Sequence, residues 1–445
     1  MRKKLIPALN KSLFLPLADR LMSTNIVRYY REIEQMISWN KEEIEKWRSL
    51  KLQNLIQHAY NNTIYYKDLF DSNKINPNEI KSIEDLSQVP HLTKDLAKEN
   101  YKKLIPTNIS SIKYIDKNTG GSSGDPFNYL LDKRSWSYVV AVNWYNWERI
   151  GYKMGNKFIA LGSSSILPSG NKSSLKHNIY YWLRGKKPIN AMNMSKEESK
   201  KHLMYIKKKN FQYIYGYASS VFLLAKAALD NNIDSTFIKG CITTSEILTD
   251  YYRKIIKEAF NCDIIDNYGA ADGGVNAFKV NEGDFNVGYN SIVRVGKKVN
   301  SIDAGGILQV TDLYNYAMPL INYQLGDSAI ISNDNHNNNY NGQVISKVYG
   351  RASDVIELSN GNVLTGPGFT IFFKDIDVEA YSIKQTGELE LMIQIKENPN
   401  YKSENDKLII QTMKKYAGAE CKIVLQKVDN FDVLKSGKRK YFMSQ

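Results

Sequence analysis

Residues 213–269 alternate short apolar segments with amphipathic ones, and this alternation limits the possible folds more than any other feature of the sequence. The pattern predicts strands at residues 213–216, 240–243 and 263–265, with helices at residues 219–229 and from Thr249 onward. Strands that alternate with helices at this spacing form a largely parallel sheet, and such sheets bind ligands at the carboxyl ends of their strands. We therefore expect an α/β fold in which Gly216, Ser245 and Gly269 lie at the edge that binds a ligand.

The pattern changes on either side of this repeat. The first hundred residues are mainly helical, and residues 288–327 alternate as strands. Farther along, the sequence predicts a strand, a helix and a strand at residues 388–396, 405–416 and 421–427, with Leu408, Ile409 and Met413 of the helix directed inward. We therefore expect a large domain of mixed, largely parallel sheets with helices and a β-subdomain at residues 1–353. A small, mobile α+β domain should follow at residues 354–445, which is within the usual size of an independent unit.

The composition excludes several classes of function. Lys and Arg total 60 against 46 Asp and Glu, giving a formal net charge of +14. The lysines are scattered and no arginine-rich arm is present, so we expect no nucleic-acid partner. Cys241, Cys262 and Cys421 lie far apart in the sequence without a CxxC pair, which argues against a disulfide framework and a structural zinc site.

The N-terminal segment leaves two interpretations open. Its basic start at residues 2–4 and apolar residues 5–9 imitate a signal peptide, but polar residues 10–12 interrupt the apolar run, so we expect a cytoplasmic protein. No run of 18 apolar residues exists, so no spanning helix is expected. The apolar cluster of Leu13, Phe14, Leu15 and Leu17 is compatible with a peripheral membrane contact and with simple packing.

The most specific local signal is the loop at residues 119–126. It combines three glycines with hydroxyl side chains, and such a loop can surround phosphate oxygens with backbone N–H groups and hydroxyls. The loop matches neither GxxxxGK[ST] nor GxGxxG. Taken alone, it is equally typical of a Ser/Gly surface loop.

Three further segments carry candidate chemistry. Tyr268 ends a predicted strand, where its ring can stack on a base, and Asp272 can hold a magnesium ion. Asp327 follows a glycine turn and offers two carboxylate oxygens to the hydroxyls of a ribose. Lys438 follows Gly437 on a loop that can reach a phosphate. Taken alone, each feature is also typical of an ordinary turn or a basic tail.

Together and in order, these segments resemble five motifs of the acyl-adenylate-forming superfamily, which includes acyl-coenzyme A synthetases and peptide-synthetase adenylation domains. The matching segments are residues 119–126 for the phosphate loop, 268–272 for YGxxE, 311–327 for TD…YxxGD, 350–354 for the hinge and 436–438 for the C-terminal lysine. Within the superfamily, residues 55–60, 65–66, 82–86, 89–94, 215–219 and 244–246 are similar to the phenylacetate-coenzyme A ligase family, including its capsular-polysaccharide-biosynthesis branch.

The resemblance implies an AMP-forming ligase that joins a carboxylic acid to ATP as an acyl-AMP. The acyl group then passes to coenzyme A or to an amine or hydroxyl of a sugar precursor, and the implied cofactors are ATP/AMP and Mg²⁺. It implies Thr119 and Lys438 as catalytic residues, Asp272 at the metal, Asp354 at the hinge, and Gly120, Gly121, Ser122, Ser123, Gly124, Ser245, Glu246, Tyr268, Gly269, Asp327 and Arg351 at the nucleotide. We expect a small or aryl acid bound near Asn143, Trp144, Tyr215 and Tyr217.

Some positions depart from the pattern. Asp272 stands where the motif has the longer Glu, and Asn322 and Gln324 stand where the family commonly has arginines. The missing positive charge would weaken nucleotide binding or change how the domains dock. The metal-binding Cys/His cluster of some members has no counterpart, so we expect no zinc. The alternative to an active ligase is a degenerate member that binds nucleotide or acyl chains without turnover, although the retained Lys438 favours activity.

Overall fold

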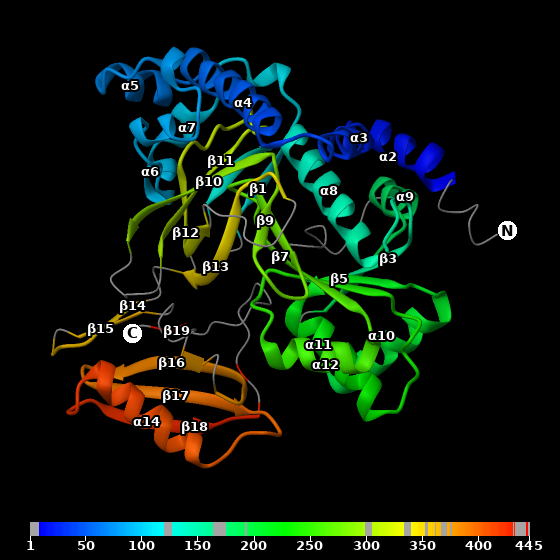
Figure 1. The fold of residues 1–445 in the computed structure, drawn as a ribbon, viewed down its shortest axis with the longest axis vertical. Coiled ribbons are helices and arrows are strands. Elements are labelled where there is room, and N and C mark those ends of the chain that lie inside the picture. Colours follow the sequence, from blue (N-terminus) through cyan, green and yellow to red (C-terminus); the bar gives the residue numbers. More distant parts are fainter. Residues whose placement is uncertain are drawn as a thin grey trace.

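The computed structural model describes residues 9–119, 127–162, 175–191, 194–298, 305–332, 340–351, 355–360, 362–365, 372–373, 376–429, 431 and 442–443. Within this part of the chain, the largest element is an eleven-stranded sheet with the order β10-β11-β12-β13-β9-β8-β7-β6-β5-β3-β4. Figure 1 shows this sheet at the centre, with helices α4 to α7 at one end of the molecule and a separate C-terminal sheet at the other.

One half of the large sheet is parallel. Its strands are β3 (Phe158–Gly162), β4 (Lys186–Asn190), β5 (Tyr213–Tyr217), β6 (Gly240–Thr244) and β7 (Asp263–Ala270). All four neighbouring pairs run parallel. Their side chains alternate between two cores, because Ile214 and Cys241 pack on one face while Tyr213 and Ile242 pack on the other. The strands are therefore buried on both faces, and this confirms the predicted α/β fold.

The other half of the sheet is antiparallel. Its strands are β8 (Val275–Val280), β9 (Phe285–Val287), β10 (Ser291–Lys298), β11 (Gly306–Asp312), β12 (Tyr323–Ser332) and β13 (Val344–Arg351). It joins the parallel half where β8 folds back along β7, with Tyr268 opposite Ala277. A separate hairpin of β1 (Tyr114–Asn118) and β2 (Asn128–Asp132) precedes the sheet in the chain.

The N-terminal part of the chain is helical, as predicted. It contains η1 (Asn10–Phe14), α2 (Leu15–Met22), α3 (Ile26–Met36), α4 (Lys41–Asn62), α5 (Ile64–Ser72), η2 (Pro77–Glu79), η3 (Asp85–Gln88), α6 (Lys94–Glu99), α7 (Tyr101–Leu104) and η4 (Ile109–Ser111). Helix α4 starts at a capping box in which the Asn40 side chain accepts from the Glu43 N–H and the Glu43 carboxylate accepts from the Asn40 N–H.

The helices after the first hairpin surround the parallel half. They are α8 (Lys133–Trp147), η5 (Glu148–Ile150), α9 (Leu175–Leu183), α10 (Lys196–Lys209), α11 (Ala218–Asp230) and α12 (Asp250–Phe260). Helix α10 starts at a second capping box, formed by Ser195 and Glu198. No helix among the described residues is long and apolar enough to cross a membrane.

A second sheet lies at the C-terminal end, with the order β18-β17-β16-β19 in the described part of the chain. The elements of this C-terminal unit are β14 (Val355–Glu357), β15 (Val363–Thr365), β16 (Val378–Gly387), β17 (Glu390–Glu397), α14 (Glu404–Ala417), β18 (Lys422–Lys427) and β19 (Phe442–Met443). Ile409 and Met413 of α14 enter the core of this unit, as predicted, but Leu408 is exposed. The prediction for Leu408 was wrong because Ile409, Met413 and Ala417, at i, i+4 and i+8, form the stripe that faces the strands.

Candidate functional site

The carboxyl ends of the central parallel strands form one edge of the sheet. Thr244 pairs with Asn267 in the β6–β7 ladder, so Ser245 follows on β6 beside Tyr268 on β7. Ser245 has a φ of 66°, a left-handed conformation that turns the chain away from the end of β6. The register thus places two of the predicted nucleotide residues, Ser245 and Tyr268, next to each other.

Glu246 sits at the start of helix α11. The Ser219 N–H donates to Glu246 Oε2 at 2.8 Å. The first N–H groups of a helix lack partners within the helix, and its positive end favours a carboxylate. Glu246 therefore fixes the start of α11 at the edge where β5 ends.

Tyr268 and Asp327 connect the two halves of the sheet at this edge. The Tyr268 hydroxyl on β7 donates to Asp327 Oδ2 on β12 at 2.6 Å. Asp327 in turn lies opposite Arg351 in the β12–β13 ladder. Three predicted nucleotide residues from distant parts of the sequence are thus brought together from β7, β12 and β13.

Asp272 lies in the turn between β7 and β8, and a buried aspartate supports this turn. Gly274 of the turn has a φ of +63°, and a Cβ there would lie 2.1 Å from Asp312 Oδ2. The Asp312 carboxylate accepts from the Ser135 hydroxyl and, at 3.0 Å, from the Tyr314 N–H. Burial raises the pKa of Asp312 to about 7. Asp312, which belongs to the TD motif, therefore packs against Gly274 and supports the turn that carries Asp272.

Tyr323 links this turn to the base of the phosphate loop. Its hydroxyl donates to Asp272 Oδ2 at 3.2 Å, and its ring centroid lies 6.3 Å from that of Phe127. The Thr119 N–H donates to the Phe127 carbonyl at 2.9 Å, and the Phe127 N–H donates to Thr119 Oγ1 at 2.9 Å. These two bonds close the base of the loop, so the loop begins and ends beside the tyrosine that contacts Asp272.

Asn322 is a buried structural residue. Its Nδ2 donates to the carbonyls of Leu86 at 2.6 Å and Val89 at 2.8 Å, and its own carbonyl accepts from the Leu92 N–H at 3.2 Å. Its φ is 49°, a left-handed conformation that Asn adopts more readily than Arg. Asn322 therefore attaches residues 86–92 of the helical N-terminal part to the start of β12.

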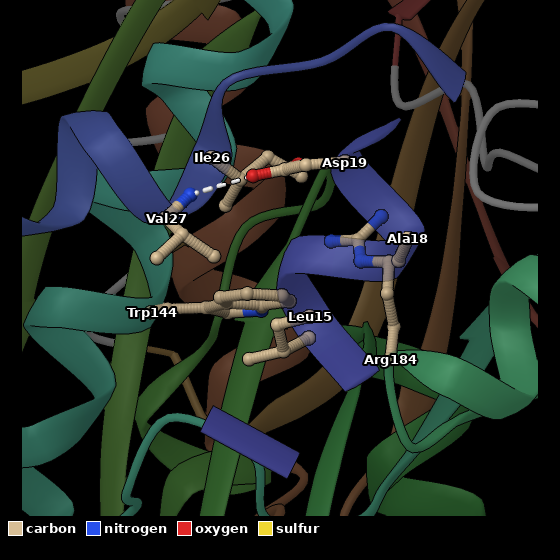
Figure 2. Close-up of a pocket in the computed structure, with 7 residues that line it drawn as sticks. All are labelled: Leu15, Ala18, Asp19, Ile26, Val27, Trp144 and Arg184. Carbon is tan, nitrogen blue, oxygen red and sulfur yellow. Dashed lines mark hydrogen bonds between the residues drawn. The ribbon is translucent and has the colours of Figure 1, made fainter. Parts of the chain in front are cut away.

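The two buried tryptophans of α8 have different neighbours. Trp144 lies against the N-terminal helices and lines a small pocket with Leu15, Ala18, Asp19, Ile26, Val27 and Arg184 (Figure 2). The tryptophan that contacts Tyr215 is Trp147, at 5.3 Å between ring centroids. These two residues lie about one turn apart along α8, so they contact different neighbours on that side of the helix.

Two of the cysteines meet in space although they are distant in the sequence. Cys241 and Cys262 are 21 positions apart, yet their Sγ atoms lie 3.8 Å from each other. The β6–β7 ladder causes this, because Cys241 pairs with Ile264. Both are free thiols, and burial raises the pKa of Cys241. The absence of zinc stays a prediction.

Several predicted residues cannot be placed. Gly120, Gly121, Ser122, Ser123, Gly124, Asp354 and Lys438 lie outside the described residues, and Arg351 is described through its backbone alone.

Ser135 and the contacts of Tyr323 were missed by the sequence analysis. Tyr323 lies inside the matched segment 311–327, so its position was available, but Ser135 belongs to no motif.

The comparisons with known proteins agree with this geometry. No family profile matches the chain. Protein CapK of Staphylococcus aureus is 27% identical over 346 residues, which cover 76% of this chain and 74% of CapK. Phenylacetate-coenzyme A ligase of Aromatoleum evansii is 28% identical over 107 residues, which cover 23% of this chain and 24% of that protein.

Solved structures share the fold. A 2-hydroxyisobutyryl-CoA ligase in the postadenylation state matches with a TM-score of 0.65 and 15% identity, over 90% of this chain and 89% of that chain. The open conformation of that ligase matches with a TM-score of 0.58 and 16% identity, over 91% of this chain and 92% of that chain. The relatives and the shared fold confirm the resemblance seen in the motifs: the chain is similar in sequence to CapK and to phenylacetate-coenzyme A ligase, and it has the fold of a 2-hydroxyisobutyryl-CoA ligase.

Proposed function

We propose that this protein activates a carboxylic acid with ATP as an acyl-AMP and transfers the acyl group to an acceptor. The observation that carries the proposal is the convergence of three motif segments on β12. Tyr323 bonds Asp272 and lies beside the loop base, and Asp327 bonds Tyr268. A nucleotide at this edge would contact a base-stacking ring, a carboxylate and a loop suited to phosphates within one continuous surface.

The nucleoside part of ATP would lie across the ends of β6 and β7. Tyr268 would stack on the adenine, with Ser245, Glu246 and Gly269 lining it, and Asp327 would accept from the ribose hydroxyls with Arg351 assisting. A carboxylate has about four acceptor positions, so the bond from Tyr268 is compatible with this role for Asp327. The Tyr268 bond would also hold that carboxylate in place before the nucleotide arrives.

The phosphates would lie between the loop and Asp272. Thr119 at the loop base and residues 120–124 would supply hydroxyl and N–H donors to phosphate oxygens. Asp272 and the loop hydroxyls would offer oxygen ligands, which Mg²⁺ prefers. Bound Mg²⁺ would supply charge neutralisation at the phosphates. Because the Asp272 side chain is one methylene shorter than Glu, the support of its turn by Asp312 determines where its oxygens lie.

Lys438 and the hinge complete the proposal. The acid's carboxylate oxygen would attack the α-phosphate, forming the acyl-AMP and releasing pyrophosphate, while the Lys438 ammonium stabilises the added negative charge. Residues 354–445 would act as a mobile domain that pivots at Asp354 between the two half-reactions. The separate sheet and core of the C-terminal unit support this division.

The acyl acceptor is coenzyme A or an amine or hydroxyl of a sugar precursor. Solved structures with this fold were determined with an acyl-AMP and CoA, which supports coenzyme A. The resemblance of the motifs to the capsular-polysaccharide-biosynthesis branch favours a sugar precursor. Near the strand ends, Tyr215 packs against Trp147, and these aromatic side chains suit a small or aryl acid.

Pyrophosphate exchange into ATP, measured across a panel of aryl, short fatty and amino acids with Mg²⁺ and without acceptor, tests the proposal. We expect exchange with one class of acid, and Lys438→Ala should reduce that exchange by about 100-fold. Measurable ATP binding without exchange for any acid would favour the degenerate alternative. Asn322 does not by itself support that alternative, because its amide already bonds two buried carbonyls. Once the acid is known, release of AMP with coenzyme A or with amino sugars would identify the acceptor.

A further inference from the structure

Two helices far apart in the sequence expose apolar side chains on one surface. On η1 and α2, Leu9, Leu13 and Leu17 recur every four residues and are exposed, with Leu13 at 49%. On α9, Leu175, Ile179 and Trp182 occur at i, i+4 and i+7 and are also exposed, with Trp182 at 68%. We call these six side chains the α2–α9 face. Contiguous exposed apolar surface of this kind marks an interaction site more often than scattered single residues do.

The two helices pack together, so the six side chains form one surface. The Phe14 and Trp182 ring centroids are 5.3 Å apart. Ala18, Tyr180 and Leu183 form a small buried cluster between the helices. Figure 1 shows α2 and α9 together on the flank of the molecule, away from the C-terminal sheet. This cluster already fills the contact between the two helices. The six side chains of the α2–α9 face lie outside it and point away from it.

A buried arginine fixes α9 to the body of the protein. The Arg184 guanidinium lies 4.7 Å from the Trp144 ring, 5.1 Å from the Tyr180 ring and 5.4 Å from the Trp136 ring. Its Nη1 donates to the Tyr180 hydroxyl at 2.9 Å. Figure 2 shows this guanidinium between α2 and Trp144. These contacts join the end of α9 to α8, so the α9 part of the α2–α9 face is presented by a fixed scaffold.

Basic residues outnumber acidic ones in the two segments that form this face. Residues 9–22 and 175–187 contain six basic residues against one acidic residue, Asp19. Three of the six add little charge to the surface: Arg184 is buried, burial lowers the pKa of Lys186 to about 7, and Lys11 lies 3.6 Å from the Glu34 carboxylate. The Asp19 carboxylate accepts from the Thr24 hydroxyl at 2.6 Å and the Val27 N–H at 2.9 Å. Arg20 and Lys187 are exposed, and the sequence has three more basic residues at positions 2–4. The surface therefore combines exposed Leu, Ile and Trp with a basic surround, and this combination is complementary to anionic lipid.

We propose that the α2–α9 face docks on the surface of an anionic membrane. The leucines, Ile179 and Trp182 enter the boundary between headgroups and acyl chains, and Arg20 and Lys187 lie at the level of the lipid phosphates. Neither helix is long enough to span a bilayer, since α9 has 9 residues and α2 has 8, so both lie in the plane of the interface. The inference does not depend on the proposed catalytic activity.

Vesicle co-sedimentation of the full chain tests the inference. We expect binding to vesicles of phosphatidylcholine with phosphatidylglycerol, weaker binding to pure phosphatidylcholine, and a decrease as salt is raised. Leu13→Glu should lower the bound fraction at least fivefold. The matched control is Leu408→Glu on α14, which changes a leucine of similar exposure, 46%, in the C-terminal unit and should bind like the wild type.

Quenching by brominated lipids tests the contact at a second residue. Trp182 is exposed whereas Trp144 and Trp147 are buried, so bromine on the acyl chains should quench the wild-type fluorescence and should quench Trp182→Phe much less. Because Phe preserves the apolar surface, Trp182→Phe should still co-sediment.

Three results would overturn the inference. They are the absence of vesicle binding by the wild type, equal binding by Leu13→Glu and the wild type, and equal quenching of Trp182→Phe and the wild type. If the wild type ran as a dimer in light scattering and Leu13→Glu as a monomer, without vesicle binding by either, the face would instead be a contact between copies of this chain.

Discussion

The two halves of the large sheet contribute to the candidate site in different ways. In the parallel half, the site residues are placed by strand ends: Ser245 and Tyr268 are neighbours because β6 and β7 are in register. In the antiparallel half, they are placed by buried hydrogen bonds, at Asp312, Asn322 and Tyr323. One half supplies an edge, and the other attaches a turn, a loop base and an N-terminal segment to it. The parallel half therefore determines where the site lies, and the antiparallel half determines how its parts are held relative to one another.

The strongest test of this difference is Gly274→Ala, on the turn that Asp312 supports. The new Cβ would lie 2.1 Å from Asp312 Oδ2, at a φ of +63° that Ala tolerates poorly. We expect a loss of roughly 2–4 kcal/mol in the free energy of unfolding, since backbone strain and overpacking add. Pyrophosphate exchange should fall about 100-fold, because a small displacement of Asp272 disturbs the phosphate site. Urea unfolding and the exchange assay measure the two effects.

Gly283→Ala is the matched control for that variant. Gly283 also has a positive φ, +100°, but nothing lies within 4 Å of a Cβ there. Backbone strain alone should cost about 1 kcal/mol and leave exchange unchanged. Equal loss of exchange in both variants would show that the support by Asp312 does not align Asp272.

The second test exchanges Asn322 for the arginine that the family commonly has at this position. Asn322→Arg removes the donors of two buried carbonyls and places a long cation at a buried site with a φ of 49°. We expect a loss of about 3 kcal/mol in the free energy of unfolding and no gain in ATP affinity. Gln324→Arg, two residues away on β12 and partly exposed, should change stability by less than about 1 kcal/mol. An Asn322→Arg protein that is stable and binds ATP more tightly would contradict the structural role.

The difference between the halves also determines what the sequence could predict. Strands β5, β6 and β7 and the helices between them follow from local apolar patterns, and Tyr268 and Asp327 follow from ordered motifs. The bond from Ser135 to Asp312 joins residues 177 positions apart, and that from Asn322 to Leu86 joins residues 236 positions apart. A local pattern carries no information about such pairs. The same reason explains the cysteines, which meet only because two strands pair.

The third test concerns the pH dependence of stability. Burial raises the pKa of Asp312 to about 7, well above the usual value near 4 of an exposed aspartate. The folded protein therefore holds a proton that the unfolded chain releases, so this residue favours folding at low pH and loses that contribution as the pH rises from about 4 to 7. Relative to Asp312→Asn, which cannot ionise, the wild type should lose a few kcal/mol of unfolding free energy over this interval, at about 1.4 kcal/mol per pKa unit.

Urea unfolding of both proteins between pH 5 and pH 8 measures this effect. The difference between them should change up to about pH 7 and become constant above it. A difference that stays constant from pH 5 to pH 8 would show that Asp312 is ionised in the folded protein throughout, and that its support of the turn is a charged one.

The smallest expected effect is at the contact between the halves. Tyr268→Phe keeps the ring but removes the hydroxyl that donates to Asp327 Oδ2 at 2.6 Å. If Asp327 is held by Tyr268 for the ribose, KM for ATP should rise roughly 5- to 15-fold, since a hydrogen bond is worth about 1–1.5 kcal/mol, while kcat changes little. Unfolding should be nearly unaffected, because this tyrosine is only half-buried. Asp327→Asn should raise KM further, because it removes the acceptor itself. A Tyr268→Phe protein with an unchanged KM would mean that the register of β12 and β13 alone positions Asp327. The hydrogen bond from Tyr268 in the parallel half would then not be needed to hold that carboxylate.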